Sequence, residues 1–335
     1  MAEIFPFRAV RYDARRVALE SVLTQPYDKI TPEMQEQYYA ASPFNLVSVE
    51  RGKSFSSDSA ENNLYTRASG ALEAWLAEGV LIQDIAPAIY GYFQEYKIPG
   101  TNQRLERRGF IALGRLADYE EGVVFRHEHT LTGPKADRLE LLRHTGAQTG
   151  QLFMLYDDPS RGIDALFEET SKQPPLAEMR DEYDVRHRLW AICEPAKIQR
   201  IRSAMADKKI IIADGHHRYE TALTYRNECR VRNGRVDPDA PYEKAMWTCF
   251  NTHQEGLTIL PTHRLVHNLA AFSVEKFLRT ASEYFSWYAY PFASAAENRP
   301  SFAEFRHDLQ RRGRAGHCIG VYAGNHAFYL LVLRN

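Results

Sequence analysis

The sequence predicts an α+β protein with mixed sheets and flanking helices, and two observations lead to this class. First, a turn at residues 99–102 separates two aromatic-rich, strand-like segments, 89–93 and 109–113, which is typical of a β-hairpin. Second, later strand-like segments are separated by segments with helical spacing, which indicates helical crossovers. Because the order is neither a strict strand–helix alternation nor an all-β series, we expect mixed sheets.

The other elements follow from the spacing of apolar residues along the chain. Thr31-Pro32 marks a helix start, and Leu64, Leu72 and Trp75 have the spacing of a helix that Gly79 is placed to cap. Further strands are expected at 152–156, 185–193, 210–213, 245–250 and 329–333, with helices around 198–205 and from Tyr219 onward.

Length and composition bound the domain organisation and the kind of partner. The chain has 335 residues, of which 44% are hydrophobic and 25% charged, and this length suits two packed lobes. We place the boundary near residue 195, which gives an N-terminal lobe at 1–194 and a C-terminal lobe at 195–335. The formal net charge is −1, so no basic field is present to attract nucleic acid, and we expect no nucleic-acid partner.

The N-terminus and the cysteines bear on localisation. The first residues lack the basic-then-apolar layout of a signal peptide, and no apolar run approaches the roughly 20 residues that a membrane span needs. The four cysteines are scattered, without the spacing of a disulfide framework. We therefore expect a cytoplasmic protein with reduced cysteines and no membrane partner, while the oligomeric state stays open.

The most informative segment is 210–218, where an isoleucine-rich strand, expected to be buried, leads into Asp214-Gly215-His216-His217-Arg218. Gly215 permits a tight turn, and a helix is expected to begin directly after it. The first amides of a helix lack intrahelical partners and carry the positive end of the macrodipole, which suits an anion. A bound phosphate would also satisfy the two imidazoles and the guanidinium, as would pairing with Asp214, Glu220 or another carboxylate. Alternatively, Asp214 is only an N-cap and the histidines are core groups.

A second polar cluster lies at His127-Glu128-His129-Thr130 and continues to Lys135 and Arg138. Imidazole and carboxylate groups ligate metals and act as general bases, so His127 and Glu128 are candidate metal ligands. The histidine spacing differs from that of the HExxH metalloprotease helix. Lys135 and Arg138 stand near an expected helix start and suit phosphate, although a solvated polar loop is the alternative.

Other motifs narrow the chemistry. The sequence contains no Walker A, GxGxxG or GxSxG motif, which argues against P-loop, Rossmann and serine-hydrolase chemistry. His263-Arg264, after Pro261-Thr262, repeats the pairing of histidine with arginine, and we interpret it as structural. Arg107 and Arg108, next to the predicted hairpin, are interpreted as surface residues.

A set of short motifs spans residues 6–264 and carries a family resemblance. The motifs are Pro6-Phe7-Arg8 with Arg11-Tyr12, Pro26-Tyr27-Asp28, Asn45, Arg108-Gly109-Phe110, His127-Glu128-x-Thr130, Lys135-x-Asp137-Arg138, the segment 214–222, and Leu260-Pro261-Thr262-His263-Arg264. Taken together, the set resembles the bacterial and archaeal family DUF1015, and this resemblance supplies no activity.

The segment Gly215-His216-His217-Arg218-Tyr219 also resembles the helix-start signature of the ParB/sulfiredoxin superfamily, which implies a nucleotide-binding core of that type. His217 and Arg218 match the signature's His and Arg that engage ATP phosphates. His216 stands where sulfiredoxin has its reactive cysteine, so sulfinic-acid repair is not expected. The helix-turn-helix and basic surface of ParB-type DNA clamps are not visible in the sequence. The free-serine kinase branch has an Asp-Gly-His signature, which Asp214-Gly215-His216 matches.

These observations predict a nucleotide-dependent phosphotransferase that acts on a small hydroxyl compound, with free serine as the leading candidate. Gly215, His217 and Arg218, together with Lys135 and Arg138, are expected to bind ATP or ADP with Mg²⁺. Asp214 or His216 would position the acceptor, and Glu128 or Asp28 would act as the base. Three alternatives stay open: a phosphatase of a small phosphomonoester, a metal-dependent hydrolase using His127, Glu128 and His129, and a non-catalytic nucleotide-binding module.

Overall fold

The chain forms two compact units, Met1–Ile259 and Leu260–Asn335. The computed structural model describes residues 2–128, 130, 132–260 and 263–334, without the side chains of Thr132 and Pro134. The predicted boundary near residue 195 is wrong, because strands from both sides of it belong to one sheet. His129, Pro261 and Thr262, which the sequence motifs include, lie outside the described residues.

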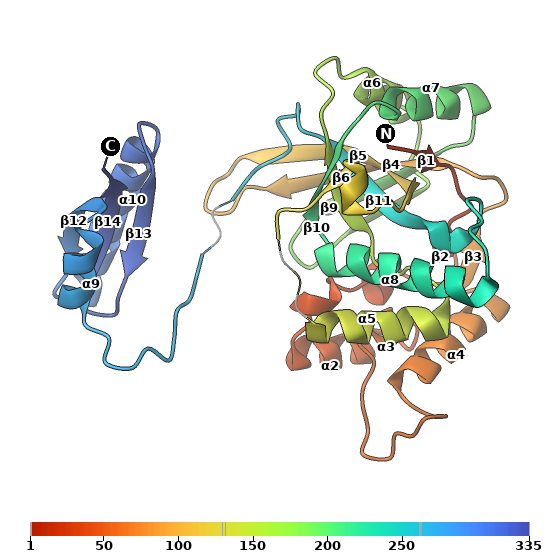
Figure 1. Ribbon diagram of the computed structural model, residues 1–335, viewed down its shortest axis with the longest axis horizontal. Helices are drawn as coiled ribbons and strands as arrows, with labels where there is room; N and C mark the ends of the chain where they lie inside the picture. Colours follow the sequence, from red (N-terminus) through yellow and green to blue (C-terminus); the bar gives the residue numbers. More distant parts are fainter. Residues whose placement is uncertain (1, 129, 131, 261–262, 335) are drawn as a thin grey trace. The chain divides into compact units, whose positions relative to one another are not determined.

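The first unit is built on a large mixed sheet, which confirms the predicted α+β class (Figure 1). Among the described residues it has nine strands in the order β6-β10-β7-β11-β5-β4-β9-β8, with β1 paired to β5. The predicted hairpin is β4–β5, and the predicted strands at 152–156, 185–193, 210–213 and 245–250 are β7, β9, β10 and β11. The bounds are β1 Ile4–Phe5, β4 Ile89–Lys97, β5 Arg104–Arg115, β6 Val124–Phe125, β7 Leu152–Tyr156, β8 Ala177–Arg180, β9 Arg186–Ile192, β10 Ile210–Asp214 and β11 Lys244–Asn251.

Strand β10 was expected to be buried throughout, and the structure corrects this. Ile210 and Ile212 are fully buried, but Ile211 is 44% exposed, because alternate side chains of a strand point to opposite faces of the sheet. The register shifts between Ile212 and Asp214, where a β-bulge or irregularity interrupts the pairing with β7. The Cα partner of Asp214 in β7 is Phe153.

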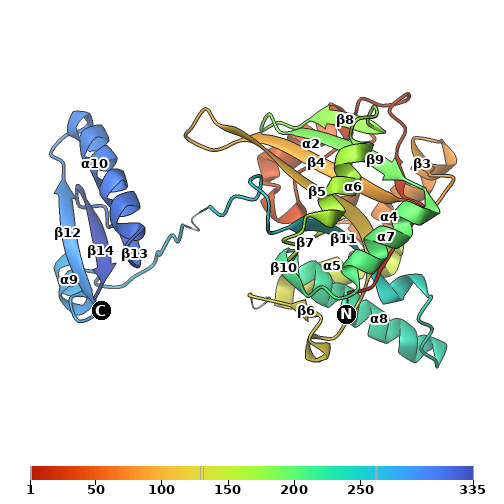
Figure 2. The same cartoon turned by 90° about the horizontal axis from the view of Figure 1, so that it is seen from above.

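Helices cover both faces of this sheet (Figures 1 and 2). Helices α6 (Gly162–Thr170) and α7 (Pro195–Met205) lie on one side, and α5 (Thr132–Thr145) and α8 (His216–Asn233) lie next to each other on the other. Arg143 of α5 donates to Glu228 of α8 at 2.5 and 3.0 Å. Lys135, near the start of α5, likewise donates to Glu220, near the start of α8. The two helices therefore run in the same direction, and the chain before α5 lies beside the start of α8.

The remaining N-terminal elements form a helical layer against α5. Tyr12, Val22, Trp75 and Leu141 share one apolar cluster that joins α4 to α5, and Gly79 ends α4 with a φ of +71°. The bounds are β2 Val10–Tyr12, α1 Leu19–Val22, η1 Tyr27–Lys29, α2 Pro32–Ala41, α3 Val47–Glu50, α4 Leu64–Ala77 and β3 Leu81–Gln83, where β2 pairs with β3. Two short helices lie elsewhere in the first unit, η2 Tyr119–Glu121 and η3 Pro241–Glu243.

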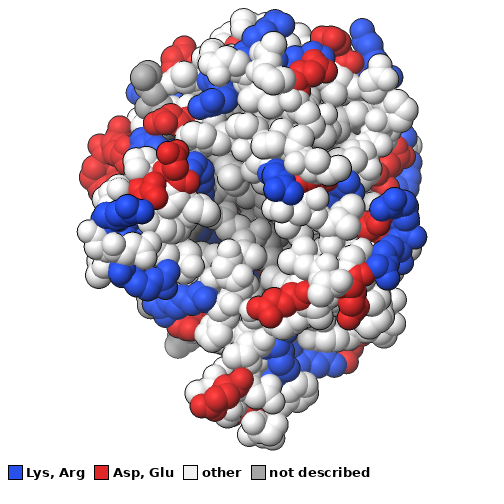
Figure 3. All heavy atoms as spheres, turned by 90° about the vertical axis from the view of Figure 1, so that its right-hand side faces the viewer, with Lys and Arg blue, Asp and Glu red and all other residues white. Residues whose placement is uncertain are grey.

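Positive and negative side chains are mixed on the face of the molecule that Figure 3 shows. On this face Lys and Arg are interspersed with Asp and Glu, and a hollow lies near its centre. This pattern agrees with the nearly balanced charge of 42 basic and 43 acidic residues. No helix formed by the described residues has both the length and the apolar character that a membrane crossing requires.

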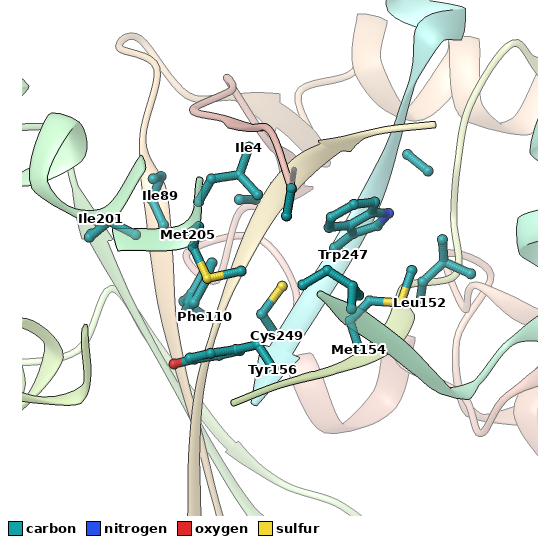
Figure 4. Close-up of a cluster of buried hydrophobic side chains, with 14 of the residues drawn as sticks. Ile4, Ile89, Phe110, Leu152, Met154, Tyr156, Ile201, Met205, Trp247 and Cys249 are labelled. Carbon is teal, nitrogen blue, oxygen red and sulfur yellow. The ribbon is translucent and has the colours of Figure 1, made fainter. Parts of the chain in front are cut away.

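The main core lies between the sheet and helices α6 and α7. Figure 4 shows Phe110, Met154 and Trp247 of the sheet pointing into the same cluster as Ile201 and Met205 of α7. Gly114 of β5 makes room for the indole ring, since a Cβ there would lie 2.0 Å from Trp247. This dense packing holds the neighbouring strand ends in fixed positions.

In the described part of the second unit, residues 260 and 263–334, a small three-stranded sheet packs with two helices. Its strand order is β12-β14-β13, and the sequence predicted only the strand at 329–333. Phe305 of α10 packs on Tyr290 and Phe328 of the sheet. The bounds are α9 Val274–Ala281, β12 Phe285–Pro291, α10 Ala295–Gly313, β13 Cys318–Tyr322 and β14 Ala327–Leu333.

Candidate functional site

The candidate site begins at Gly215, the N-cap of α8. Gly215 has a φ of +97°, a conformation that L side chains rarely adopt. A Cβ at this position would also lie 3.0 Å from Leu152 and 3.2 Å from the Arg218 guanidinium. Both conditions require glycine, and the chain can therefore turn from β10 directly into a helix, as predicted.

His216, the first residue of α8, faces the segment that precedes α5. Only 3% of the residue is exposed, and its ring packs edge-on against His127 at 4.6 Å between centroids. Burial, and then the neighbouring His127, lower the pKa of His216 below its ordinary 6.5. The His127 amide donates to His216 Nε2 at 3.5 Å, so the proton of the neutral ring is on Nδ1, which is 3.8 Å from Glu128 Oε2.

Glu220 lies one helical turn after His216 and contacts the same segment. It accepts hydrogen bonds from Arg126 at 3.1 Å, from Lys135 at 3.0 Å and from the Thr130 hydroxyl. Burial raises the pKa of Glu220, but the hydrogen bonds from Thr130 and Lys135 outweigh it, and the net pKa is lowered from 4.5. Glu220 is therefore the ion that fixes Arg126, Thr130 and Lys135 to α8.

Arg218 is held by acceptors on the sheet side of the turn. Its Nη2 donates to Asp214 at 2.9 Å, and its Nη1 donates to the Gln151 carbonyl. Asp214 is 64% exposed and Arg218 is 20% exposed in this pair. Carboxylates thus neutralise the cations at the start of α8. The sequence predicts either this pairing or a bound phosphate.

Arg138 has a different environment from Lys135. Its guanidinium donates to Glu50 at 3.1 Å and to Asp137 at 2.7 Å, and only 8% of the side chain is exposed. Its Cζ lies 4.2 Å from the ring centroid of Tyr27. Burial raises the pKa of Tyr27, while the charges of Arg138 and Arg218 oppose this shift. The adjacent Asp28 is exposed on η1.

The two clusters found in the sequence meet in space. His127 and Glu128 contact His216, and Lys135 contacts Glu220, so both sides of the predicted site are present around the first turn of α8. His217 is half-buried in the same turn. The described residues contain no group of three or more His, Cys, Asp or Glu side chains that could hold a metal ion.

Sequence reasoning gave Glu220 no role beyond a possible ion-pair partner, and it missed Arg126. The i, i+4 spacing of His216 and Glu220 was the available signal, because it places both side chains on one face of α8. Arg126 carries no such signal, since its pairing depends on how the loop after β6 meets α8. The interpretation of Arg107 as a surface residue is wrong: this side chain lies half-buried on the sheet, over Phe153 and Phe250.

These features define an α+β protein in which a strand–glycine–helix turn gathers imidazole, guanidinium, ammonium and carboxylate groups. The chain belongs to the DUF1015 family, described as a protein of unknown function, whose model matches residues 4–335. No curated protein and no solved structure matches this chain. The function must therefore be argued from the site itself.

Proposed function

We propose that the chain is a nucleotide-dependent phosphotransferase that acts on a small hydroxyl compound. The observation that carries this proposal is the meeting of the two clusters, which surrounds the first turn of α8 with Arg126, Lys135 and Arg218. Phosphoryl transfer depends on positioning and charge stabilisation, and it asks for little covalent chemistry from the protein. A helix start with several cations suits that requirement.

The residues at this turn fit the phosphates of ATP or ADP. The α8 N-cap, a glycine, provides no side-chain acceptor for the first-turn amides within the described structure, which leaves this end suited to an anionic ligand. Arg218 is held by Asp214, whose side chain is largely exposed, and exposed ion pairs contribute only about 0–1 kcal/mol. A phosphate group can therefore replace Asp214 as the partner of Arg218 at little cost.

Each remaining residue receives a role in this proposal. Neutral His216 orients the acceptor, and Glu128, whose Oε2 lies 3.8 Å from His216 Nδ1, is the base that accepts the acceptor's proton. Because the described residues gather no three carboxylates or imidazoles around one point, Mg²⁺ would be held chiefly by the phosphates of the nucleotide, with Asp214 as its protein ligand, and it would neutralise phosphate charge. Because Arg138 already pairs with two carboxylates, we now assign it to holding Tyr27 and α5 rather than to binding phosphate.

The resemblance of residues 215–219 to the ParB/sulfiredoxin signature supports the choice of a nucleotide and of a core of that type. Within that superfamily, Asp214-Gly215-His216 is similar to the free-serine kinase signature. Free serine is therefore the first acceptor to test. This part of the proposal rests on sequence motifs alone.

The test is isothermal titration of the protein with ATP, ADP and AMP, with and without Mg²⁺. We expect binding that disappears in a His217→Ala, Arg218→Ala double variant, because this variant lacks both side chains that we assign to the phosphates. Arg235→Ala is the control, since Arg235 is 77% exposed in its side chain and lies after the end of α8. Undiminished affinity in the double variant would contradict the assignment, and ³¹P NMR with serine would test transfer itself.

One contact favours a second candidate, a phosphatase of small phosphomonoesters. The pair of His216 and Glu128, at 3.8 Å, is also an arrangement that activates water. The two functions differ in the need for a donor. Release of phosphate from phosphoserine without any nucleotide would favour the phosphatase, whereas transfer that requires ATP would favour the kinase.

A further inference from the structure

Arg107 lies on the face of the sheet opposite helices α6 and α7. Its neighbour Phe110, three residues on, belongs to the core beneath those helices, whereas Ile111 packs on the other side with Tyr90. Side chains alternate along a strand, so Arg107 shares the face of Ile111. The rings of Phe153 and Phe250 lie on this face too, with centroids 4.8 and 4.9 Å from Arg107 Cζ.

Arg107 is a half-buried cation that pairs with no carboxylate of the described chain. Its Nε and Nη2 donate to Gln94 Oε1 at 3.0 and 2.6 Å, and burial lowers its pKa. By contrast, Arg138 pairs with Glu50 and Arg230 with Glu243. Burying a charge is costly unless an opposite charge compensates it, and the two aromatic rings compensate only in part.

The hydrogen bonds to Gln94 leave one edge of the guanidinium available. They occupy the Nε–Nη2 edge, and within the described chain no side chain or carbonyl accepts from Nη1. The Nη1–Nη2 edge presents two parallel N–H groups, which match the two coplanar oxygens of a carboxylate. The flanking phenyl rings restrict the fork and shield it from water, and this strengthens such a contact.

A glycine maintains this arrangement. Gly109 is the Cα partner of Phe250, and a Cβ at Gly109 would lie 2.5 Å from the Phe250 ring. Without a side chain at this position, the ring can lie against β5 beside Arg107. The Arg-Gly-Phe motif at 108–110 thus has a physical reason on the Arg107 side of the sheet.

The position of Phe153 connects Arg107 with the start of α8. Phe153 is the Cα partner of Asp214, the residue that precedes Gly215, and its ring contacts Arg107. Neighbouring strands are about 4.8 Å apart, so a molecule roughly 5–10 Å long spans from the turn to the guanidinium. We propose that Arg107 binds the carboxylate of the acceptor, which makes the substrate a hydroxy acid, hydroxy amino acids included; this deepens the proposed function and rests on it.

The test uses the full chain and ω-hydroxy carboxylates of increasing chain length, titrated by ligand-detected NMR, with the matching neutral amides as probes that lack the charge. We expect the carboxylates to bind to the wild type. Arg107→Gln should lower their affinity at least about tenfold, which corresponds to the loss of one good charge-assisted contact. Arg104→Gln, on the same strand and paired with Asp184 at 2.6 Å, is the matched control and should change nothing. Arg107→Lys keeps the charge without the fork, and we expect an intermediate affinity.

Several outcomes would overturn the inference. They are equal affinity of wild type and Arg107→Gln, amides that bind as well as carboxylates, or no carboxylate binding by the wild type. ATP titrated into the same samples separates this inference from the proposed function: Arg107→Gln should still bind ATP. If that variant loses ATP instead, the partner of Arg107 is a phosphate and the carboxylate assignment is wrong. If the wild type binds carboxylates but not ATP, only the proposed nucleotide dependence is rejected, and the role of Arg107 stands.

Discussion

Lys135 Nζ and Glu220 Oε2 lie 3.0 Å apart, although the two residues are separated by 85 positions in the sequence. The pair joins the first turn of α5 to the start of the second turn of α8, and these two helices pack next to each other on one face of the sheet. Arg126 and Thr130 donate to the same carboxylate. The geometry of the candidate site therefore depends on a residue that need not touch any ligand.

We expect Glu220→Gln to destabilise the protein by about 1–3 kcal/mol, because the substitution leaves partly buried donors without their ionic acceptor. Glu228→Gln is the matched control on the same helix. Its pair with Arg143 is exposed by about 40% on both sides, and such pairs contribute only about 0–1 kcal/mol. Urea unfolding measures both changes, and equal losses in the two variants would contradict the role of Glu220.

The lowered pKa of Glu220 also predicts a pH dependence. The unfolded chain takes up this proton near pH 4.5 and the folded chain only at lower pH. The stabilisation is therefore fully present above pH 4.5 and is lost as the pH falls through the folded value. Wild type should lose more stability than Glu220→Gln over that interval, and unfolding midpoints measured across it provide the check.

Much of the first unit was predictable because its signals are local. The apolar segments at β7, β9, β10 and β11 each predict a strand, and Gly215 predicts the turn. The division into units was not predictable in this way. The sheet interleaves strands from both sides of residue 195, and such long-range pairing depends on tertiary packing rather than on local pattern.

The same distinction applies to the site. His216, His217 and Arg218 are contiguous, so their chemistry is visible in the sequence. Arg107 was interpreted as a surface residue because it neighbours a hairpin turn. Only the pairing of the strands places Phe250 opposite Gly109, and thereby next to Arg107. Charge pairs such as Arg138 with Glu50, 88 positions apart, likewise have no local signal.

His216 should make stability fall on the acid side of neutrality. Its pKa is lowered from 6.5, chiefly by burial, so the unfolded chain is protonated first as the pH drops. Stability is thus full above pH 6.5 and decreases below it towards the folded value. His216→Gln should lack this decrease between pH 6.5 and 5, roughly the interval in which ordinary histidines titrate, and an unchanged pH profile would show that the ring is not kept neutral.

Gly215→Ala should destabilise the protein by about 1–3 kcal/mol, since it combines a positive φ with a close contact. Gly234→Ala is the control at the other end of α8. Gly234 has a φ of +65°, and a Cβ there would meet no atom within 4 Å, so only the conformational cost of about 1–2 kcal/mol applies. The midpoint of thermal unfolding should be lower for Gly215→Ala than for Gly234→Ala. The reverse order would contradict the argument that a Cβ at position 215 is too close to Leu152.

Asp214→Asn separates phosphate binding from catalysis in the proposed function. Asp214 holds Arg218 at 2.9 Å and places a negative charge beside the first turn of α8. Removing that charge frees the guanidinium, so we expect metal-free ATP to bind about two- to fivefold more tightly, the effect of one exposed ion pair. With Mg²⁺ and the acceptor present, turnover should fall instead, because a magnesium ligand and an acceptor-positioning group are lost. Asp237→Asn, outside the site, should alter neither quantity, and weaker metal-free binding by Asp214→Asn would place the phosphate away from Arg218.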